Sequence, residues 1–147
     1  MKKTVLVGGC FDILHYGHIY FLKEARKLGD YLIVILESDA RIKKLKGQKR
    51  PIHNQKQRKE ILESLKFVDE VLISKDIMTD QDYENLVKKI NPQIIAITKG
   101  NKTKTHAELV SAKVVEIKKI EGFSTTKILS ILHINQRLPQ FQKDKQL

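Results

Sequence analysis

Short apolar runs alternate with amphipathic stretches along this chain, and that alternation limits the folds open to it. The run YLIVILES, residues 31–38, is apolar over its first six positions, which is typical of a strand covered on both faces. Similar strand-length runs recur at residues 3–9, 69–74, 92–98 and 113–118. Apolar residues fall at helical spacing in residues 18–29, 54–67, 79–91 and 124–134. This order predicts an α/β fold with a parallel sheet and right-handed crossovers.

The length and composition fit one globular domain. The chain has 147 residues, and its hydrophobic content of 41% is ordinary for a folded protein. We expect the domain to cover residues 1–135 and a polar C-terminal tail to cover residues 136–147. The segment between residues 38 and 54 is basic and broken by glycine and proline, so we expect a loop there.

Membrane and secretory signals are weak in this sequence. No run of about 18 apolar residues is present, so we expect no transmembrane helix and no membrane partner. The basic start is followed by too short an apolar run for a secretory signal. Cys10 is the single cysteine, which excludes an internal disulfide and fits a reducing compartment. We therefore expect a cytoplasmic protein.

The net charge of +11 first suggests nucleic acid as a partner. However, the lysines are spread along the whole chain, aromatic residues make up only 6%, and there is no tryptophan to stack on bases. The lysines do cluster in residues 41–50 and 99–105. Such clusters suit a pocket for a small polyanion, so we expect no nucleic-acid partner.

Four segments that follow predicted strands share a polar, flexible character. They carry small, hydroxyl or basic residues and cover residues 9–18, 37–47, 98–105 and 121–126. The carboxyl ends of parallel strands meet at one edge of a sheet, where ligands of open α/β sheets bind. The four segments therefore predict a phosphate-rich ligand site at that edge.

The first of these segments, within GGCFDILHYGHIYFLKEA at residues 8–25, suits anion binding. Gly8 and Gly9 let the backbone approach a ligand, and Gly17 allows a tight start of the next helix. A helix start presents free N–H groups and a partial positive charge. His15 and His18 would add imidazole donors that stabilise charge developing on a phosphate.

Two other interpretations of the H-x-G-H pattern stay open. The histidines could simply cap or pack the helix. Alternatively, Cys10, Asp12, His15 and His18 could bind zinc, because a spacing of three residues on a turn can serve a metal. A zinc site would leave the glycines and the downstream lysines unexplained, so we predict no metal bound directly by the protein.

The segments GGCFDILHYGH and EGFSTTKI resemble the HxGH nucleotidyltransferase superfamily, in its cytidylyltransferase-like branch. That branch includes the adenylyltransferase domain of ADP-heptose synthesis, glycerol-3-phosphate cytidylyltransferase and archaeal FAD synthase. The resemblance covers roughly residues 3–132. It implies a Rossmann-like three-layer sandwich with a central parallel sheet of about five strands, and a homodimer.

The resemblance also implies roles for individual residues. His15, His18 and Lys46 would be catalytic, and His15 and His18 would contact the nucleotide phosphates as well. The remaining nucleotide-binding positions would be Gly9, Cys10, Phe11, Lys99, Gly100, Ser124, Thr125 and Thr126. The acceptor would contact Asp12, Arg58 and Lys119.

The chemistry implied is direct attack by an acceptor phosphate oxygen on the α-phosphorus of a nucleoside triphosphate. Mg²⁺ assists, pyrophosphate leaves, and no protein nucleophile is needed. Residues 38–52 resemble the adenylyl-transferring branches, and STTKI resembles the heptose type. We therefore expect ATP and a sugar 1-phosphate as substrates, with FMN as an alternative acceptor or CTP with glycerol 3-phosphate as an alternative pair.

The chain departs from the family pattern at two places. The loop TKGNKTKT, residues 98–105, lacks the acidic residue that the family often carries there. Lys119 stands nearest to where the glycerol-3-phosphate branch has an arginine, which keeps the charge and loses the bidentate fork. The first departure keeps open a nucleotide-binding module without turnover, and the net charge keeps open a nucleic-acid binder.

Overall fold

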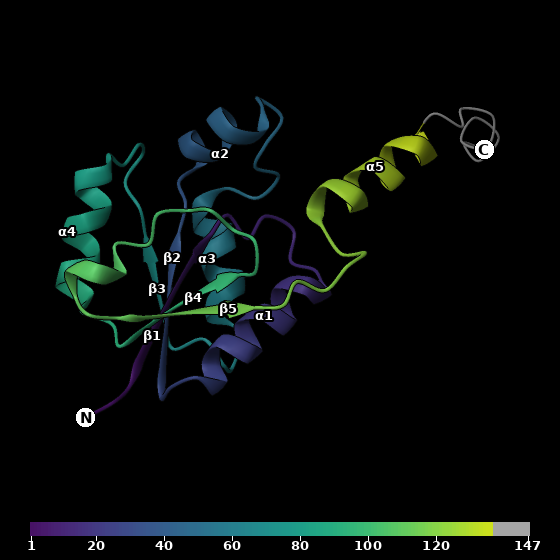
Figure 1. The fold of residues 1–147 in the computed structure, drawn as a ribbon. Helices are drawn as coiled ribbons and strands as arrows, with labels where there is room; N and C mark the ends of the chain where they lie inside the picture. Colours follow the sequence, from purple (N-terminus) through teal and green to yellow (C-terminus); the bar gives the residue numbers. More distant parts are fainter. Residues whose placement is uncertain (137–147) are drawn as a thin grey trace.

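Five parallel strands form one sheet at the centre of the protein (Figure 1). The structure is a computed structural model that describes the backbone of residues 1–136 and the side chains of residues 1–132. The strands are β1 (Thr4–Gly9), β2 (Tyr31–Leu36), β3 (Glu70–Ile73), β4 (Ile94–Thr98) and β5 (Lys113–Ile117). The predicted parallel α/β fold is confirmed.

The strand order is β3-β2-β1-β4-β5, so the chain reverses its direction of travel across the sheet next to β1. After β1 the sheet grows through β2 and β3, and then β4 returns to the other side of β1. The loops that follow β1 and β4 therefore separate at the carboxyl edge. This is the place where open α/β sheets bind their ligands.

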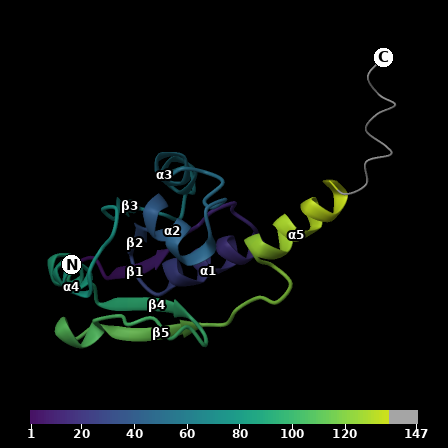
Figure 2. The same cartoon turned by 90° about the horizontal axis from the view of Figure 1, so that it is seen from above.

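Helices cover both faces of the sheet and make it a three-layer sandwich (Figure 2). The helices are α1 (Tyr16–Lys27), α2 (Asp39–Lys46), α3 (Gln55–Glu63), α4 (Asp80–Ile90), the 3₁₀ turn η1 (Ala107–Leu109) and α5 (Thr125–Gln136). Val5 and Val7 of β1 pack with Leu22 of α1 and Leu62 of α3. Leu6, from the opposite face of β1, packs with Val87 and Ala107 on the side of α4 and η1. Alternate residues of one strand thus enter two cores, which explains the continuous apolar runs.

α2 is a helix where the sequence analysis expected a loop over residues 38–54. Ser38 caps it, since its Oγ accepts a hydrogen bond from the Arg41 N–H at 3.1 Å. Asp39 lies in the first turn, lysines lie in the last, and Ile42 is fully buried. Charges at both ends favour the helix dipole, so the lysine-rich composition that suggested a loop in fact stabilises this short helix.

α5 leaves the body of the protein and points away from the sheet (Figures 1 and 2). Only its start is anchored: Thr125 is buried, whereas Ile131 and Leu132 are exposed. No helix within residues 1–136 is both long enough and apolar enough to cross a bilayer. Of the predicted tail at residues 136–147, residues 137–147 lie outside the described part of the chain.

Gly29 joins α1 to β2, and its role is close packing. α1 ends at the C-cap Leu28, which keeps a right-handed conformation. A Cβ atom at Gly29 would lie 2.4 Å from the Lys3 carbonyl oxygen, a backbone atom beside β1. The next residue, Asp30, donates its N–H to that same oxygen at 2.7 Å. The connection therefore fits only a residue without a side chain.

Gly29→Ala should lower the free energy of unfolding by about 1–3 kcal/mol, because backbone atoms must move to admit the methyl group. Urea unfolding followed by circular dichroism measures the change. Gly8→Ala is the matched control, since a Cβ there meets its nearest neighbour, the Ile35 carbonyl oxygen, at 3.8 Å. Equal stabilities of the two variants would contradict this account of Gly29.

Candidate active site

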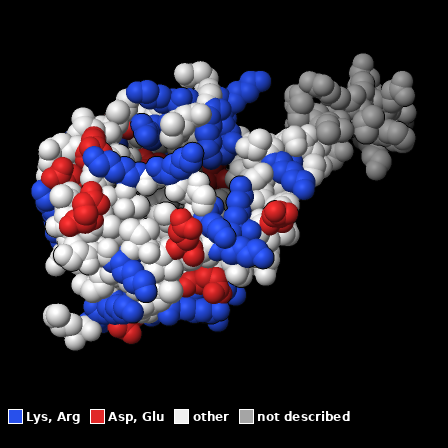
Figure 3. All heavy atoms as spheres, in the orientation of Figure 1, with Lys and Arg blue, Asp and Glu red and all other residues white. Residues whose placement is uncertain are grey.

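A cavity of about 490 Å³ opens at the carboxyl edge of the sheet. The loops after β1, β4 and β5 form its walls, together with the starts of α1 and α5 and the end of α2. Figure 3 shows Lys and Arg side chains over α2 and beside the start of α5, with a hollow between them. The predicted site residues that line the cavity are Gly9, Cys10, Phe11, Asp12, His15, His18, Lys46, Lys99, Gly100, Lys119, Ser124, Thr125 and Thr126.

The loop after β1 holds an unusual backbone conformation. Phe11 and Ile13 both have positive φ, 47° and 54°, which residues with side chains rarely adopt. Tertiary hydrogen bonds hold this loop: Thr125 Oγ1 donates to the Asp12 carbonyl oxygen at 2.6 Å, and Arg58 Nη1 donates to the Cys10 carbonyl oxygen at 2.7 Å. Strained backbone that the surrounding structure fixes in this way is characteristic of functional sites.

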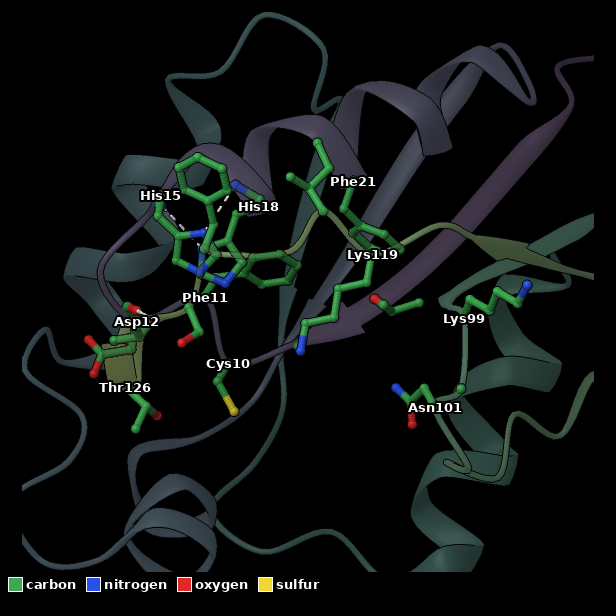
Figure 4. Close-up of a pocket in the computed structure, with 18 of the residues that line it drawn as sticks. Cys10, Phe11, Asp12, His15, His18, Phe21, Lys99, Asn101, Lys119 and Thr126 are labelled. Carbon is green, nitrogen blue, oxygen red and sulfur yellow. Dashed lines mark hydrogen bonds between the residues drawn. The ribbon is translucent and has the colours of Figure 1, made fainter. Parts of the chain in front are cut away.

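The H-x-G-H segment forms the cap of α1. His15 is the N-cap residue, and its Nδ1 accepts the Gly17 N–H at 3.1 Å. His18 reaches back so that its Nδ1 accepts the His15 N–H at 3.3 Å. The two imidazole rings stack with centroids 3.7 Å apart (Figure 4). Because both Nδ1 atoms accept hydrogen bonds, the Nε2–H groups of the neutral rings remain as the free donors.

Gly17 makes this stack possible. A Cβ atom at this position would lie 2.9 Å from Cε1 of His15 and 3.3 Å from Cβ of Phe123. The position between the histidines must therefore lack a side chain for the ring of His15 to lie over the helix start. The capping interpretation of the histidines and their place in a ligand cavity are thus compatible.

Both histidines favour the neutral state in the cavity. Burial lowers the pKa of His18 to about 3, and the nearby His15 and Lys46 act in the same direction. Burial also lowers the pKa of His15, and Lys119 adds to this effect. At neutral pH the pair therefore offers hydrogen-bond donors without positive charge.

The positive charge of the cavity comes from lysines. Lys46 at the end of α2, Lys99 after β4, and Lys118 and Lys119 after β5 all line it. Lys119 is a predicted site residue, whereas its neighbour Lys118 lines the cavity without having been predicted. Among the described residues that line the cavity, Asp12 contributes the one carboxylate. The cavity is thus suited to a ligand with several negative charges.

The carboxylate of Asp12 is used inside the protein. It is fully buried and accepts hydrogen bonds from Nε of Arg50 at 2.9 Å and from the N–H groups of Ile52 and His53 at 2.8 and 3.0 Å. Burial raises the pKa of Asp12, but the hydrogen bonds from His53, Ile52 and Arg50 outweigh it and lower the pKa overall. Asp12 was predicted to bind the acceptor. Its carboxylate instead joins the β1 loop to the segment between α2 and α3.

Arg58 does not face the cavity, contrary to the prediction that it binds an acceptor phosphate. Its side chain is fully buried, with Nε donating to the His53 carbonyl oxygen at 2.9 Å and Nη1 to that of Cys10. Nη2 pairs with the Asp39 carboxylate at 2.7 Å. All three nitrogens are engaged, so Arg58 is a structural residue that joins α2, α3 and the β1 loop.

The arrangement offers little for covalent or metal chemistry by the protein itself. Burial raises the pKa of the Cys10 thiol, against the lowering effect of Lys46, so the thiol stays protonated at neutral pH. Among the side chains of residues 1–132, no three from His, Cys, Asp or Glu are grouped so that they could hold a metal ion. What the site does provide is hydrogen-bond donors and positive charge around one space.

Comparison with known proteins decides the family. A family model described as cytidylyltransferase-like matches residues 6–131. The chain belongs to the cytidylyltransferase-like family. The resemblance to nucleotidyltransferases that the motifs indicate is therefore confirmed.

Relatives named "Bifunctional protein HldE" match most of this chain. The protein from Campylobacter concisus is 44% identical over 133 residues, which are 87% of this chain and 26% of the relative. The protein from Aliarcobacter butzleri is 40% identical over 140 residues, 92% of this chain and 28% of the relative. The chain thus spans about a quarter of the length of these relatives.

A solved structure is similar over its whole length. The lipopolysaccharide core biosynthesis protein from Thermoplasma volcanium aligns with a TM-score of 0.69 at 32% identity, covering 82% of this chain and 100% of that chain. This agrees with the Rossmann-like α/β fold described above.

The lowered pKa of His18 predicts a pH dependence of stability. Below about pH 6.5, the unfolded chain binds a proton at His18 that the folded state accepts only near pH 3. The free energy of unfolding should therefore fall with decreasing pH in this window, by up to about 1.4 kcal/mol per pH unit from this residue. Urea unfolding at pH 7 and pH 5 measures the loss, and His18→Gln should lose less than the wild type. Equal losses in the two proteins would contradict this role of His18.

Proposed function

We propose that this domain transfers a nucleotidyl group from a nucleoside triphosphate to a small phosphorylated acceptor and releases pyrophosphate. The observation that carries the proposal is the pair of stacked, neutral histidines whose free Nε2–H groups lie in a lysine-lined cavity at the carboxyl edge of the sheet. Donors that are already oriented stabilise charge developing on a phosphoryl group without reorganisation during the reaction.

In the proposed reaction, an oxygen of the acceptor phosphate attacks the α-phosphorus of the triphosphate. The bond from that phosphorus to the oxygen that bridges to the β-phosphate breaks, and pyrophosphate leaves with that oxygen. His15 and His18 would donate hydrogen bonds to the phosphoryl oxygens, and Lys46 would neutralise their charge. The protein needs no nucleophile of its own, because positioning and charge stabilisation are sufficient.

The start of α5 would hold the leaving pyrophosphate. Ser124 and Thr126 line the cavity there, and a helix start presents free N–H groups to an anion. The hydroxyl of Thr125 is already used in its hydrogen bond to the Asp12 carbonyl oxygen. We therefore assign Thr125 to anchoring the helix start beside the β1 loop.

We propose that Mg²⁺ enters the cavity bound to the triphosphate, as part of the substrate. The donor set supports this view, because the Asp12 carboxylate already accepts three hydrogen bonds and the other charged side chains lining the cavity are lysines. Phosphate oxygens are suitable ligands for Mg²⁺, which usually keeps several waters in such sites. The metal would neutralise phosphate charge that the lysines leave uncompensated.

For the substrates we propose ATP and a sugar 1-phosphate of the heptose type. The identity of 40–45% to proteins named HldE over most of this chain supports this choice, together with the resemblance of residues 38–52 and STTKI to the adenylyl-transferring, heptose-type branch. The structural neighbour is named as a lipopolysaccharide core biosynthesis protein, which also suits a sugar phosphate. FMN, and CTP with glycerol 3-phosphate, are the alternatives that the assay must include.

Pyrophosphate release should be fastest with ATP and a heptose 1-phosphate. The assay combines ATP or CTP with a heptose 1-phosphate, FMN or glycerol 3-phosphate, at one Mg²⁺ and one salt concentration. We expect the preferred pair to exceed the others at least about tenfold in kcat/KM, equivalent to about 1.4 kcal/mol. Binding of CTP tenfold tighter than ATP would contradict adenylyl transfer, and nucleotide binding without any turnover would indicate a non-catalytic module.

His18→Ala should lower kcat by about 10²-fold with a smaller change in KM, because the imidazole acts mainly as charge develops in the transition state. Steady-state kinetics on the preferred pair measure both constants. His18→Asn separates catalysis from helix capping, since its amide oxygen can still accept the His15 N–H. Turnover like the wild type in either variant would remove His18 from the catalytic role.

We also propose that the domain acts as a homodimer in the cytoplasm. The family resemblance supports the dimer, and the exposed Ile131 and Leu132 on α5 supply apolar surface for an interface. The single Cys10 supports a reducing compartment.

A further inference from the structure

The start of the loop of residues 99–106 forms the wall of the cavity opposite the histidines (Figure 4). Thr98, Lys99, Gly100 and Asn101 line the cavity, and Gly100 turns the chain with a φ of 83°. Asn101 folds back on the loop, since its Oδ1 accepts hydrogen bonds from the N–H and the hydroxyl of Thr103. These bonds are local and do not attach the loop to the rest of the protein.

The far end of this loop is joined to α4 through one residue. Asp80 Oδ2 lies 2.7 Å from Nζ of Lys104, and Asp80 Oδ1 lies 3.1 Å from Nε2 of His106. Among the side chains of residues 1–132, these are the polar contacts that join residues 102–106 to α4, and the other hydrogen bonds of these residues run to Asn101 or to η1, which follows directly in the chain. We call Asp80, Lys104 and His106 the Asp80 cluster.

The environment of His106 makes the Asp80 cluster more than a surface ion pair. His106 is 3% exposed and has a positive φ of 55°, so both its ring and its backbone are fixed in place. Asp80 is the first residue of α4, a helix whose own start is fixed by a capping box between Thr79 and Asp82. A carboxylate on a capped helix start thus holds a loop that contains no acidic residue of its own.

We propose that Asp80 is a positioning residue for the nucleotide, which it serves by holding the 99–106 loop against the cavity through Lys104 and His106. This proposal rests on the function proposed above. It identifies the residue that keeps the loop on the nucleotide side of the cavity ordered. Asp80 does not line the cavity, so it would act through the loop rather than by touching the ligand. A loop that is already ordered loses less conformational entropy when the nucleotide binds.

The electrostatic effect of Asp80 on its own has the opposite sign. Removing a negative charge near a cavity for polyanions should strengthen nucleotide binding. Weaker binding after loss of Asp80 can therefore be attributed to the loop rather than to the field. Because the two effects change nucleotide affinity in opposite directions, one pair of variants can distinguish them.

The test compares Asp80→Ala with Glu84→Ala in the full chain. Both variants remove one negative charge from α4, exposed at Asp80 and half-buried at Glu84, but Glu84 pairs with Lys88 on the same helix and makes no hydrogen bond to the loop. Calorimetric titration with ATP and Mg²⁺ gives Kd, steady-state kinetics give kcat, and hydrogen–deuterium exchange reports the order of residues 100–106.

For Asp80→Ala we expect a Kd raised about fivefold, an unchanged kcat at saturating ATP and faster exchange in the loop. For Glu84→Ala we expect Kd unchanged or lowered and loop exchange like the wild type.

Several outcomes would overturn the inference. Unchanged loop exchange in Asp80→Ala would show that the Asp80 cluster does not order the loop. Equal changes of Kd in the two variants would assign the effect to charge alone. A wild-type chain that binds no nucleotide would instead contradict the proposed function, and loop exchange would then decide whether the Asp80 cluster orders the loop.

Discussion

The buried carboxylate of Asp12 is the interaction on which the rest of the site depends. It accepts three hydrogen bonds from the segment between α2 and α3, while the carbonyl oxygen of the same residue accepts the hydroxyl of Thr125. One residue thus joins the β1 loop, the segment that follows α2 and the start of α5. Because three donors compensate its charge, the carboxylate can stay ionised inside the protein. The left-handed conformations of Phe11 and Ile13 persist because these bonds fix the loop from several sides.

The two histidines show how one set of atoms serves both stability and chemistry. Each ring uses Nδ1 to satisfy a backbone N–H at the start of α1, and this fixes the ring and its tautomer. The other nitrogen of each ring is then a donor whose orientation the helix cap decides. Burial and neighbouring charges keep the rings neutral, so in the proposed reaction a phosphate would meet oriented dipoles while the lysines would supply the formal charge. The Mg²⁺ proposed to accompany the triphosphate would complete this division of roles.

Much of the fold could be predicted because a parallel sheet leaves a strong pattern. Strands buried on both faces need continuous apolar runs, and five of the six residues of YLIVIL in β2 are buried. α2 was missed because its signal is electrostatic: four of its eight residues are lysine or arginine, and only Ile42 is buried. Asp12 and Arg58 were placed in the right part of the fold but given the wrong partners. Their partners include backbone groups as well as the side chains of Arg50 and Asp39, and most of them lie on other elements. No local pattern distinguishes a carbonyl oxygen or a carboxylate from a phosphate as the partner of a guanidinium. The contact between Asp80 and His106 could not be predicted either, because its two side chains come from different elements.

The hydrogen bond between Thr125 and Asp12 joins residues 113 positions apart in the sequence, from the loop after β1 to the start of α5. Strand β1 and its loop are synthesised before the rest of the sheet, whereas the start of α5 follows every strand of the sheet. During synthesis the sheet can therefore form while the end of the cavity beside α5 is still missing. The strained β1 loop can form its hydrogen bond to Thr125 only after residue 125 has been synthesised. Among the elements that the structure describes, the cavity is thus complete only after all five strands have been synthesised.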